Sequence, residues 1–280
     1  MRVPGTQMHW RQFLRALGRE LKDDNVVDVA AAVAFFGILA LFPFLLFLVA
    51  LASVLIDVST AESLIGSLEA IAPAAVTDIL GERIRALGER SSTGLLTLGA
   101  ALALWTASGG AMALMRALNR AFGVTESRPF WKTRGIALLV TLAVAVLGLL
   151  AALITVVTPI VVEALGGGWG GVLVRALRIP IAGLLVSILW ALLFYFLPNT
   201  RRTLRVFSPG SLVGVVLWLA VSWAFSFYVA NFGNYDATYG AIGGVIVLLL
   251  WMLLSVLAFL LGAEINDLVF KQRQKGKAGA

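Results

Sequence analysis

Long apolar runs constrain this chain more than any other feature, because six of them fill most of its 280 residues. A helix needs roughly 20 apolar residues to cross the hydrocarbon core of a bilayer. Lipid offers no hydrogen-bond partners, so each span must satisfy its own backbone amides, and the alternating pattern of a barrel strand is absent. The sequence therefore predicts an all-α fold, a polytopic membrane bundle with spans at about 29–56, 94–118, 136–162, 179–197, 208–231 and 240–263.

Lysine and arginine residues gather on alternate sides of the predicted spans. Of the 22 basic residues, 17 fall in the leader, the second loop, the fourth loop and the tail, and 5 fall in the loops on the other side. The positive-inside rule assigns the richer side to the cytoplasm. Six spans return the chain to the side on which it began, so both termini are predicted to be cytoplasmic.

Composition excludes several classes of function. Hydrophobic residues make up 60% of the chain and charged residues 13%, which is typical of a membrane protein. The net charge of +7 comes from cations beside the membrane, so it predicts contact with lipid head groups and no nucleic-acid partner. The chain has no cysteine and one histidine, His9, and the acids of its cytoplasmic face are dispersed along the sequence. We therefore expect no metal site and no other cofactor.

Segments outside the spans also carry structural signals. The leader, 1–28, is predicted to be a basic amphipathic helix, which suits either the inner membrane surface or packing beneath the bundle. Residues 57–93 are predicted to form an outer helical hairpin. Residues 166–171 match a dinucleotide-binding glycine pattern, but their place between two membrane helices predicts a flexible turn instead. The membrane domain covers 29–270, and a basic tail, 271–280, follows it.

The predicted spans hold almost no charge, apart from Glu264 at the end of the last one. Ionisable groups inside a membrane mark proton relays, so their scarcity argues against a proton pump but leaves room for a passive pathway. Trp, Tyr and small polar side chains are frequent instead, and they either hold helices together or line a cavity for an amphiphile, a lipid or a neutral solute. The candidate pathway or ligand contacts are Trp105, Ser108, Asn231, Tyr235, Tyr239 and Glu264.

Glu264 needs a partner if it is buried, because an uncompensated carboxylate is costly away from water. The expected partners are cytoplasmic arginines or backbone amides at the start of the fifth span. The arginines are Arg116, Arg120 and Arg134, and the amides are those near Pro209 and Gly210. With such a partner, Glu264 acts either as a structural clamp on the last helix or as a gate.

Prolines and glycines indicate where helices bend, begin or approach one another. Pro43 lies in the middle of the first span, where the missing amide predicts a kink. Ser208 and Pro209 are predicted to be the N-cap and the first helical residue of the fifth span. Two small-x-x-x-small pairs predict close helix packing: Gly210 with Gly214, and Gly240 with Gly244.

At its most distinctive stretches the chain resembles the YihY/virulence factor BrkB family of bacterial inner-membrane proteins. The resemblance covers nearly the whole sequence, and it departs from the family at Phe35 and Phe36, where members often carry tyrosines. It implies six membrane helices with both ends in the cytoplasm, in the bacterial inner membrane. The matching residues are Phe42-Pro43, Trp105, Ser108, Leu118-Asn119, Arg128-Pro129, Trp131-Lys132, Leu197-Pro198-Asn199, Pro209-Gly210, Tyr235, Tyr239-Gly240, Trp251 and Gly262-Ala263-Glu264-Ile265-Asn266.

An old label calls family members ribonuclease BN, but the sequence predicts no enzyme. RNA cleavage needs a metal held by clustered ligands or a general acid–base pair, and neither is evident. We expect a transporter that moves a small organic or amphiphilic molecule outward. The alternative is an envelope protein without transport activity, which handles lipids or anchors an envelope complex. Membrane lipids are the expected partners, a small-molecule or lipid ligand is compatible with the sequence, and oligomerisation is left open.

Overall fold

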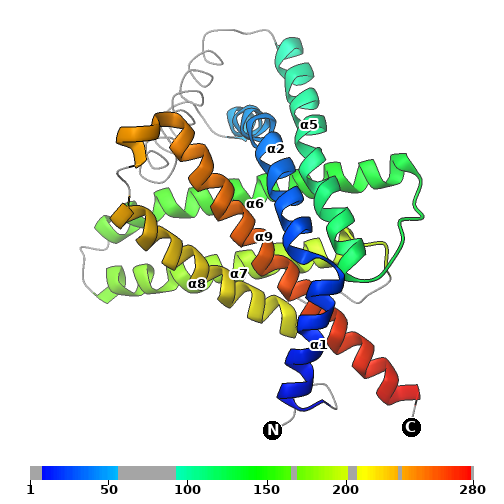
Figure 1. Ribbon diagram of the computed structural model, residues 1–280. Coiled ribbons are helices and arrows are strands. Elements are labelled where there is room, and N and C mark those ends of the chain that lie inside the picture. The colour runs from blue at the N-terminus through cyan, green and yellow to red at the C-terminus, as the bar shows by residue number, and fades with distance from the viewer. Residues whose placement is uncertain (1–7, 56–92, 165–168, 201–206, 233–234, 279–280) are drawn as a thin grey trace. The chain divides into compact units, whose positions relative to one another are not determined.

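The computed structural model describes residues 8–55, 93–164, 169–200, 207–232 and 235–278. Within these ranges every regular element is a helix (Figure 1). Their bounds are α1 Trp10–Asp23, α2 Val26–Leu55, α5 Thr93–Ala121, α6 Phe130–Ala164, α7 Trp169–Phe196, α8 Pro209–Phe232 and α9 Tyr235–Ala278. The predicted all-α membrane fold is confirmed, while the predicted outer hairpin at 57–93 lies almost wholly outside the described residues.

Five helices contain a described stretch that is long and apolar enough to cross a membrane. A sixth stretch, Gly183–Phe196 in α7, is apolar but shorter. It falls within the predicted fourth span, and the six-span count remains a prediction. The five candidate spans are Val26–Leu48, Leu98–Ala121, Phe130–Ala151, Pro209–Val229 and Gly243–Lys275.

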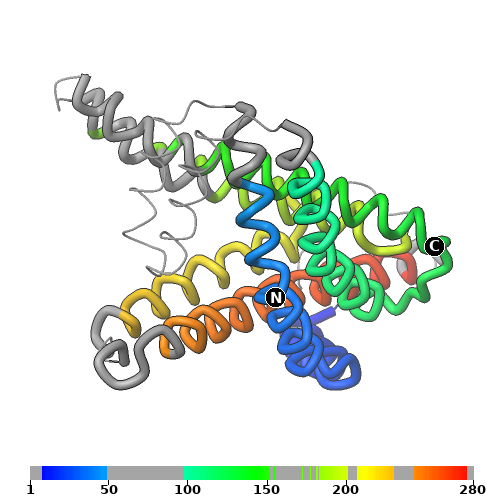
Figure 2. Tube along the Cα trace, turned by 90° about the horizontal axis from the view of Figure 1, so that it is seen from above, coloured from blue at the N-terminus to red at the C-terminus, as the bar shows by residue number. Residues whose placement is uncertain are grey.

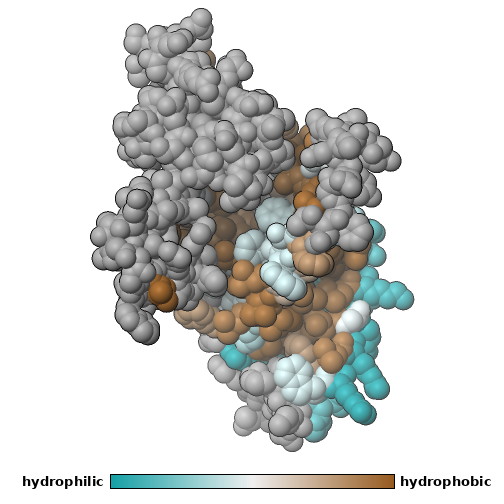
Figure 3. Space-filling view, turned by 90° about the vertical axis from the view of Figure 1, so that its left-hand side faces the viewer, coloured by the Kyte–Doolittle hydropathy of each residue, from teal (hydrophilic) through white to brown (hydrophobic). Residues whose placement is uncertain are grey.

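Large apolar side chains project outward from these helices. On α8, Trp223 is 75% exposed, and Val216 and Phe227 are also exposed. Figure 3 shows apolar side chains over most of the described face, with hydrophilic ones gathered along one edge. A helix that is apolar on all sides is stable only where its surroundings are apolar too, so this surface suits contact with lipid chains.

The chain divides into two compact units. The first unit comprises Met1–Ile38, Gly110–Ala137 and Ser187–Ala280, and so contains α1, α8 and α9 with the adjoining ends of α2, α5, α6 and α7. The second unit comprises Leu39–Gly109 and Leu138–Val186, the remaining parts of those four helices. The candidate site described below belongs entirely to the first unit.

Helices α8 and α9 lie side by side as an antiparallel pair (Figures 1 and 2). The Trp218 indole donates a hydrogen bond to Ser255 Oγ at 3.1 Å, and the Trp251 indole donates one to Ser222 Oγ at 3.3 Å. As the chain advances along α8, its partners therefore move back along α9. These tryptophans and serines, which the sequence assigned either to helix packing or to a cavity lining, join the two helices.

Glycines bring α8 and α9 into backbone contact at the other end of the pair. A Cβ placed on Gly262 would lie 2.6 Å from the carbonyl oxygen of Gly210 and 3.7 Å from the Cα of Gly214. The amide of Gly210 donates a hydrogen bond to Asn266 Oδ1 at 2.9 Å. The helix start is confirmed as predicted, since Pro209 is the first residue of α8 and Ser208 Oγ accepts a hydrogen bond from the Ser211 amide at 3.1 Å.

Two helix boundaries differ from those predicted. Helix α9 continues to Ala278 through the predicted tail, because its Leu268 and Val269 form a buried apolar cluster with Phe13 and Leu17 of α1. Burial of that face favours the packed alternative for the leader helix over a purely lipid-bound one. Helix α7 begins at Trp169, so the last two glycines of the predicted flexible turn belong to its first turn.

Candidate functional site

Helix α1 presents two carboxylates on one face at its C-terminal end. Glu20 and the C-cap residue Asp24 are one helical turn apart, so their side chains project from the same side. The next residue, Asn25, has φ 48°, a left-handed conformation that asparagine tolerates better than most residues and that commonly ends a helix. The chain then turns at once into α2 at Val26. The turn leaves Glu20 and Asp24 beside α9.

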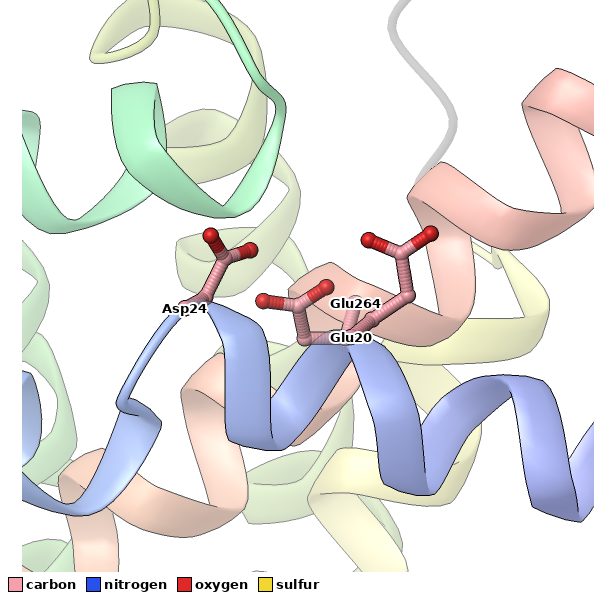
Figure 4. A group of neighbouring side chains, drawn as sticks. All are labelled: Glu20, Asp24 and Glu264. Carbon is pink, nitrogen blue, oxygen red and sulfur yellow. The ribbon is translucent and has the colours of Figure 1, made fainter.

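Glu264 of α9 completes a group of three acids, which we call the carboxylate cluster: Glu20, Asp24 and Glu264. One carboxylate oxygen from each residue lies within 4.8 Å of those of the other two. Figure 4 shows the three side chains close together, two from α1 and its cap and one from α9. Glu264 is 0% exposed, and among the described residues no amide, hydroxyl or basic group donates a hydrogen bond to either of its carboxylate oxygens.

Two basic residues offset part of the negative charge. Lys271 Nζ lies 2.7 Å from Asp267 Oδ2 and 3.3 Å from Glu20 Oε1. Arg120 Nε lies 3.9 Å from Asp24 Oδ1, which is beyond hydrogen-bond distance. Lys271 also pairs with buried Asp267, so it is shared between two carboxylates.

Burial raises the pKa of Asp24, and the neighbouring charge of Glu20 acts in the same direction. A side-chain hydrogen bond with Glu264, together with the charges of Arg120 and Lys271, lowers this pKa in part, but burial dominates. Three carboxylates this close cannot all remain ionised without compensation, because like charges repel strongly where water is excluded. The cluster can therefore hold a proton or bind a cation.

The expected partners of Glu264 were wrong. Arg120 approaches Asp24, and the amide of Gly210 donates to Asn266 Oδ1. Glu264 faces two acids instead. The sequence could not show this, because the close approach depends on how α1 packs against α9.

The sequence reading of the cytoplasmic acids as dispersed was also wrong, since Glu20 and Asp24 are brought to Glu264 by the fold. One signal was present in the sequence. Like charges four residues apart on a helix destabilise it, so the Glu20–Asp24 pair indicates that a group of opposite charge, a proton or a cation lies nearby to offset the repulsion.

A second polar network joins the loop after α5 to the end of α7. Arg128 pairs with Glu126 through Nη2–Oε2 at 2.6 Å and Nε–Oε1 at 2.8 Å, and its Nη2 also donates to the carbonyl of Leu197 at 2.7 Å. Buried Asn119 accepts a hydrogen bond from the Asn199 amide at 2.7 Å and donates one to Glu126 at 2.9 Å. A guanidinium on the last carbonyls of α7 is favoured by the helix dipole. These contacts explain several of the motif residues as structural.

Hydrogen bonds from Arg128 lower the pKa of Glu126 to about 2, and the bond from Asn119 adds to this effect. Partial burial acts in the opposite direction and is outweighed. Glu126 is therefore ionised at any physiological pH.

The remaining predicted site residues fall in different places. Trp105 and Ser108 lie on α5 in the second unit, where Trp105 is 41% exposed and buried Ser108 donates to the Trp105 carbonyl at 2.7 Å. The side chains of Asn231, Tyr235 and Tyr239 lie outside the described residues.

Of the residues predicted to shape the helices, Pro43 lies inside α2, and its kink stays a prediction. Gly210 and Gly214 lie against α9, as described above. Gly240 and Gly244 lie in α9, and their packing role stays a prediction.

Comparison with known proteins agrees with this membrane architecture. The ribonuclease-like protein YfkH of Bacillus subtilis (strain 168) is 36% identical over 251 residues, which cover 88% of this chain and 90% of the relative. A UPF0761 membrane protein of Xanthomonas campestris pv. campestris (strain 8004) is 28% identical over 271 residues, 90% of this chain but 59% of the relative. No solved structure matches the chain. The family defined as Virulence factor BrkB matches residues 17–280, a range that includes Glu20, Asp24 and Glu264. This integral membrane protein therefore belongs to the Virulence factor BrkB family.

Proposed function

We propose that this protein is an inner-membrane transporter that moves a small organic or amphiphilic molecule outward. The observation that carries the proposal is Glu264, a fully buried carboxylate in the long apolar helix α9 to which no amide, hydroxyl or basic group among the described residues donates a hydrogen bond. Ionisable groups in membrane segments are expensive and typically mark ion or substrate pathways. If α9 served only to anchor the protein in the membrane, an apolar residue at position 264 would give a more stable fold.

The proposed topology has six spans, with α7 as the fourth, and both termini in the cytoplasm. The distribution of basic residues and the five candidate spans support it. Because the chain contains no cysteine, single cysteines report topology without background. Cysteines replacing Arg19 and Lys275 are expected to resist a membrane-impermeant maleimide in intact cells and to react after permeabilisation. Labelling of either position in intact cells contradicts this topology.

Flux through reconstituted protein tests transport directly. Liposomes containing the wild type are loaded with a cell-extract metabolite mixture, and efflux of each compound class is followed by mass spectrometry. We expect saturable efflux of one class, lost in Glu264→Gln and retained in Asp28→Asn, which neutralises an exposed acid in the first turn of α2. The absence of saturable efflux for every class contradicts the proposal.

Lipid handling is the second candidate, and the exposed face of α1 favours it. Trp10 and Leu14 remain exposed beside Arg11 and Arg15, although Phe13 and Leu17 are buried against α9. An exposed Trp and Leu flanked by arginines suits an anionic membrane surface. Photo-crosslinking from position 14 in native membranes is expected to capture lipid under this candidate, and a complete lack of captured lipid or partner protein excludes it.

We propose further that the protein has no ribonuclease activity. A phosphodiester would have to reach the cluster for acid–base or metal-assisted cleavage, and Glu264 is fully buried. Purified protein incubated with RNA and Mn²⁺ is expected to leave the RNA intact. Cleavage by the wild type that disappears in Glu264→Gln contradicts this expectation.

A further inference from the structure

We propose that the carboxylate cluster of Glu20, Asp24 and Glu264 is a binding site for one divalent metal cation of the oxygen-preferring class, Mg²⁺, Mn²⁺ or Ca²⁺. The inference goes beyond transport and does not depend on it. Three acids alone would not make a site. The second observation is Glu264, whose carboxylate is completely buried, receives no hydrogen bond from an amide, hydroxyl or basic group in the described structure and reaches the other two acids.

The chemistry of the ligands selects the class of ion. Hard cations prefer carboxylate oxygens, whereas zinc and copper sites usually include His or Cys. The chain has no cysteine, and its one histidine, His9, is the N-cap at the opposite end of α1 from Asp24. An all-oxygen site therefore favours Mg²⁺, Mn²⁺ or Ca²⁺, with water completing the coordination shell.

The spacing of the ligands is compatible with one shared ion. Two oxygens on opposite sides of an ion are separated by twice the metal–oxygen distance, about 4.6–5.2 Å for Ca²⁺ and about 4.0–4.2 Å for Mg²⁺. The three carboxylate oxygens lie within 4.8 Å of one another. The arrangement is therefore compatible with one shared ion, and small rotations of the Glu20 or Asp24 side chain can bring all three oxygens to coordination distance.

The charge balance and the access route agree with a divalent ion. Three acids lie close together, Arg120 and Lys271 pair with Asp24 and Glu20 among them, and a divalent cation would offset the negative charge at Glu264. Glu264 is closed off from solvent, but the side chains of Glu20 and Asp24 are only partly buried. An ion can therefore enter past Glu20 and Asp24, while Glu264 stays shielded from water. Its attraction for a cation is strongest in that environment.

Manganese binding to the full-length protein in detergent tests the site. The protein is stripped with EDTA, exchanged into buffer and titrated with MnCl₂ while free Mn²⁺ is measured by electron paramagnetic resonance. We expect one tight site per chain in the wild type and in the control Asp28→Asn. Affinity is expected to fall on the order of 10–100-fold or more in Glu264→Gln and Asp24→Asn, since each removes a ligand. Competition with MgCl₂ and CaCl₂ ranks the three ions.

Two results overturn the inference. If the wild type binds none of the three ions, the carboxylates share a proton and the site is not metallic. If Glu264→Gln and Asp24→Asn retain wild-type affinity, any bound Mn²⁺ lies on other surface acids. Gel filtration and circular dichroism verify folding of each variant, and Asp24→Asn at the helix cap decides the question if Glu264→Gln does not fold. Failure of metal binding leaves the flux assay for transport unaffected, so the two ideas are separable.

Discussion

Glu264 and Asp24 approach each other as two acids, although one lies in the last helix and the other at the end of the first. A carboxylate oxygen of each lies within 4.8 Å of the other. The pairing is made possible by Phe13 and Leu17, whose burial against Leu268 and Val269 holds α1 on α9. Apolar packing therefore imposes an electrostatic arrangement that is unfavourable without a proton or a cation.

Gly210→Ala is expected to destabilise the α8–α9 pair, because the new methyl group meets the backbone carbonyl of Gly262, which cannot rotate away as a side chain could. Overpacking of this kind costs about 1–3 kcal/mol, so the melting temperature in detergent falls. The control is Gly18→Ala on α1, where nothing lies within 4 Å of the added Cβ. That control is neutral or slightly stabilising by helix propensity. Equal melting temperatures for both variants contradict the close contact.

Glu126→Gln is expected to lower stability at neutral pH by roughly 1–2 kcal/mol, through loss of charge-assisted hydrogen bonds with Arg128. The folded pKa of Glu126 is about 2, below its ordinary value of 4.5. The ionised pair therefore stabilises the fold fully above pH 4.5, and this contribution is lost as pH falls through about 2. Thermal unfolding of both proteins between pH 7 and pH 3 should show their difference shrinking toward acid. A difference that grows on acidification is inconsistent with this ion pair.

Phe13→Ala is expected to release α1 from α9 locally, because Phe13 is buried in the cluster that joins the two helices. Trypsin sites at Arg11, Arg15 and Arg19 then become accessible, and cleavage in the native state speeds up. Leu14→Ala is the control, since Leu14 is 58% exposed. Similar cleavage rates for the two variants would mean that α1 does not depend on α9 for its position.

Much of the fold could be predicted from the sequence, because membrane helices are recognisable one at a time from length and hydropathy. Pro209 begins α8 as its ring geometry suggests, and Gly210 and Gly214 lie where close packing was expected. The extension of α9 beyond 263 could not be predicted from hydropathy. It depends on an apolar face that packs against α1.

The candidate site was predictable only in part. Glu264 stood out as an acid at the end of an apolar helix, but its neighbours depend on a long-range contact between α1 and α9. The cytoplasmic arginines of the sequence predicted an attractive ion pair with Glu264, but the structure places two other carboxylates beside it. Tertiary packing brings Glu20 and Asp24 to Glu264, and no local pattern contains that information.

Our central claim is that Glu264, a buried acid without a partner of opposite charge, lowers the stability of the folded protein and serves its function. Thermal unfolding of wild type and Glu264→Gln in detergent with EDTA at pH 8 tests it most directly. The neutral amide removes one charge from the cluster and can donate a hydrogen bond to Asp24, so the variant is expected to melt at the same temperature or higher, while efflux from liposomes is lost. A melting temperature several degrees below wild type, as for loss of a buried ion pair, would show that Glu264 is a structural clamp and would contradict the claim.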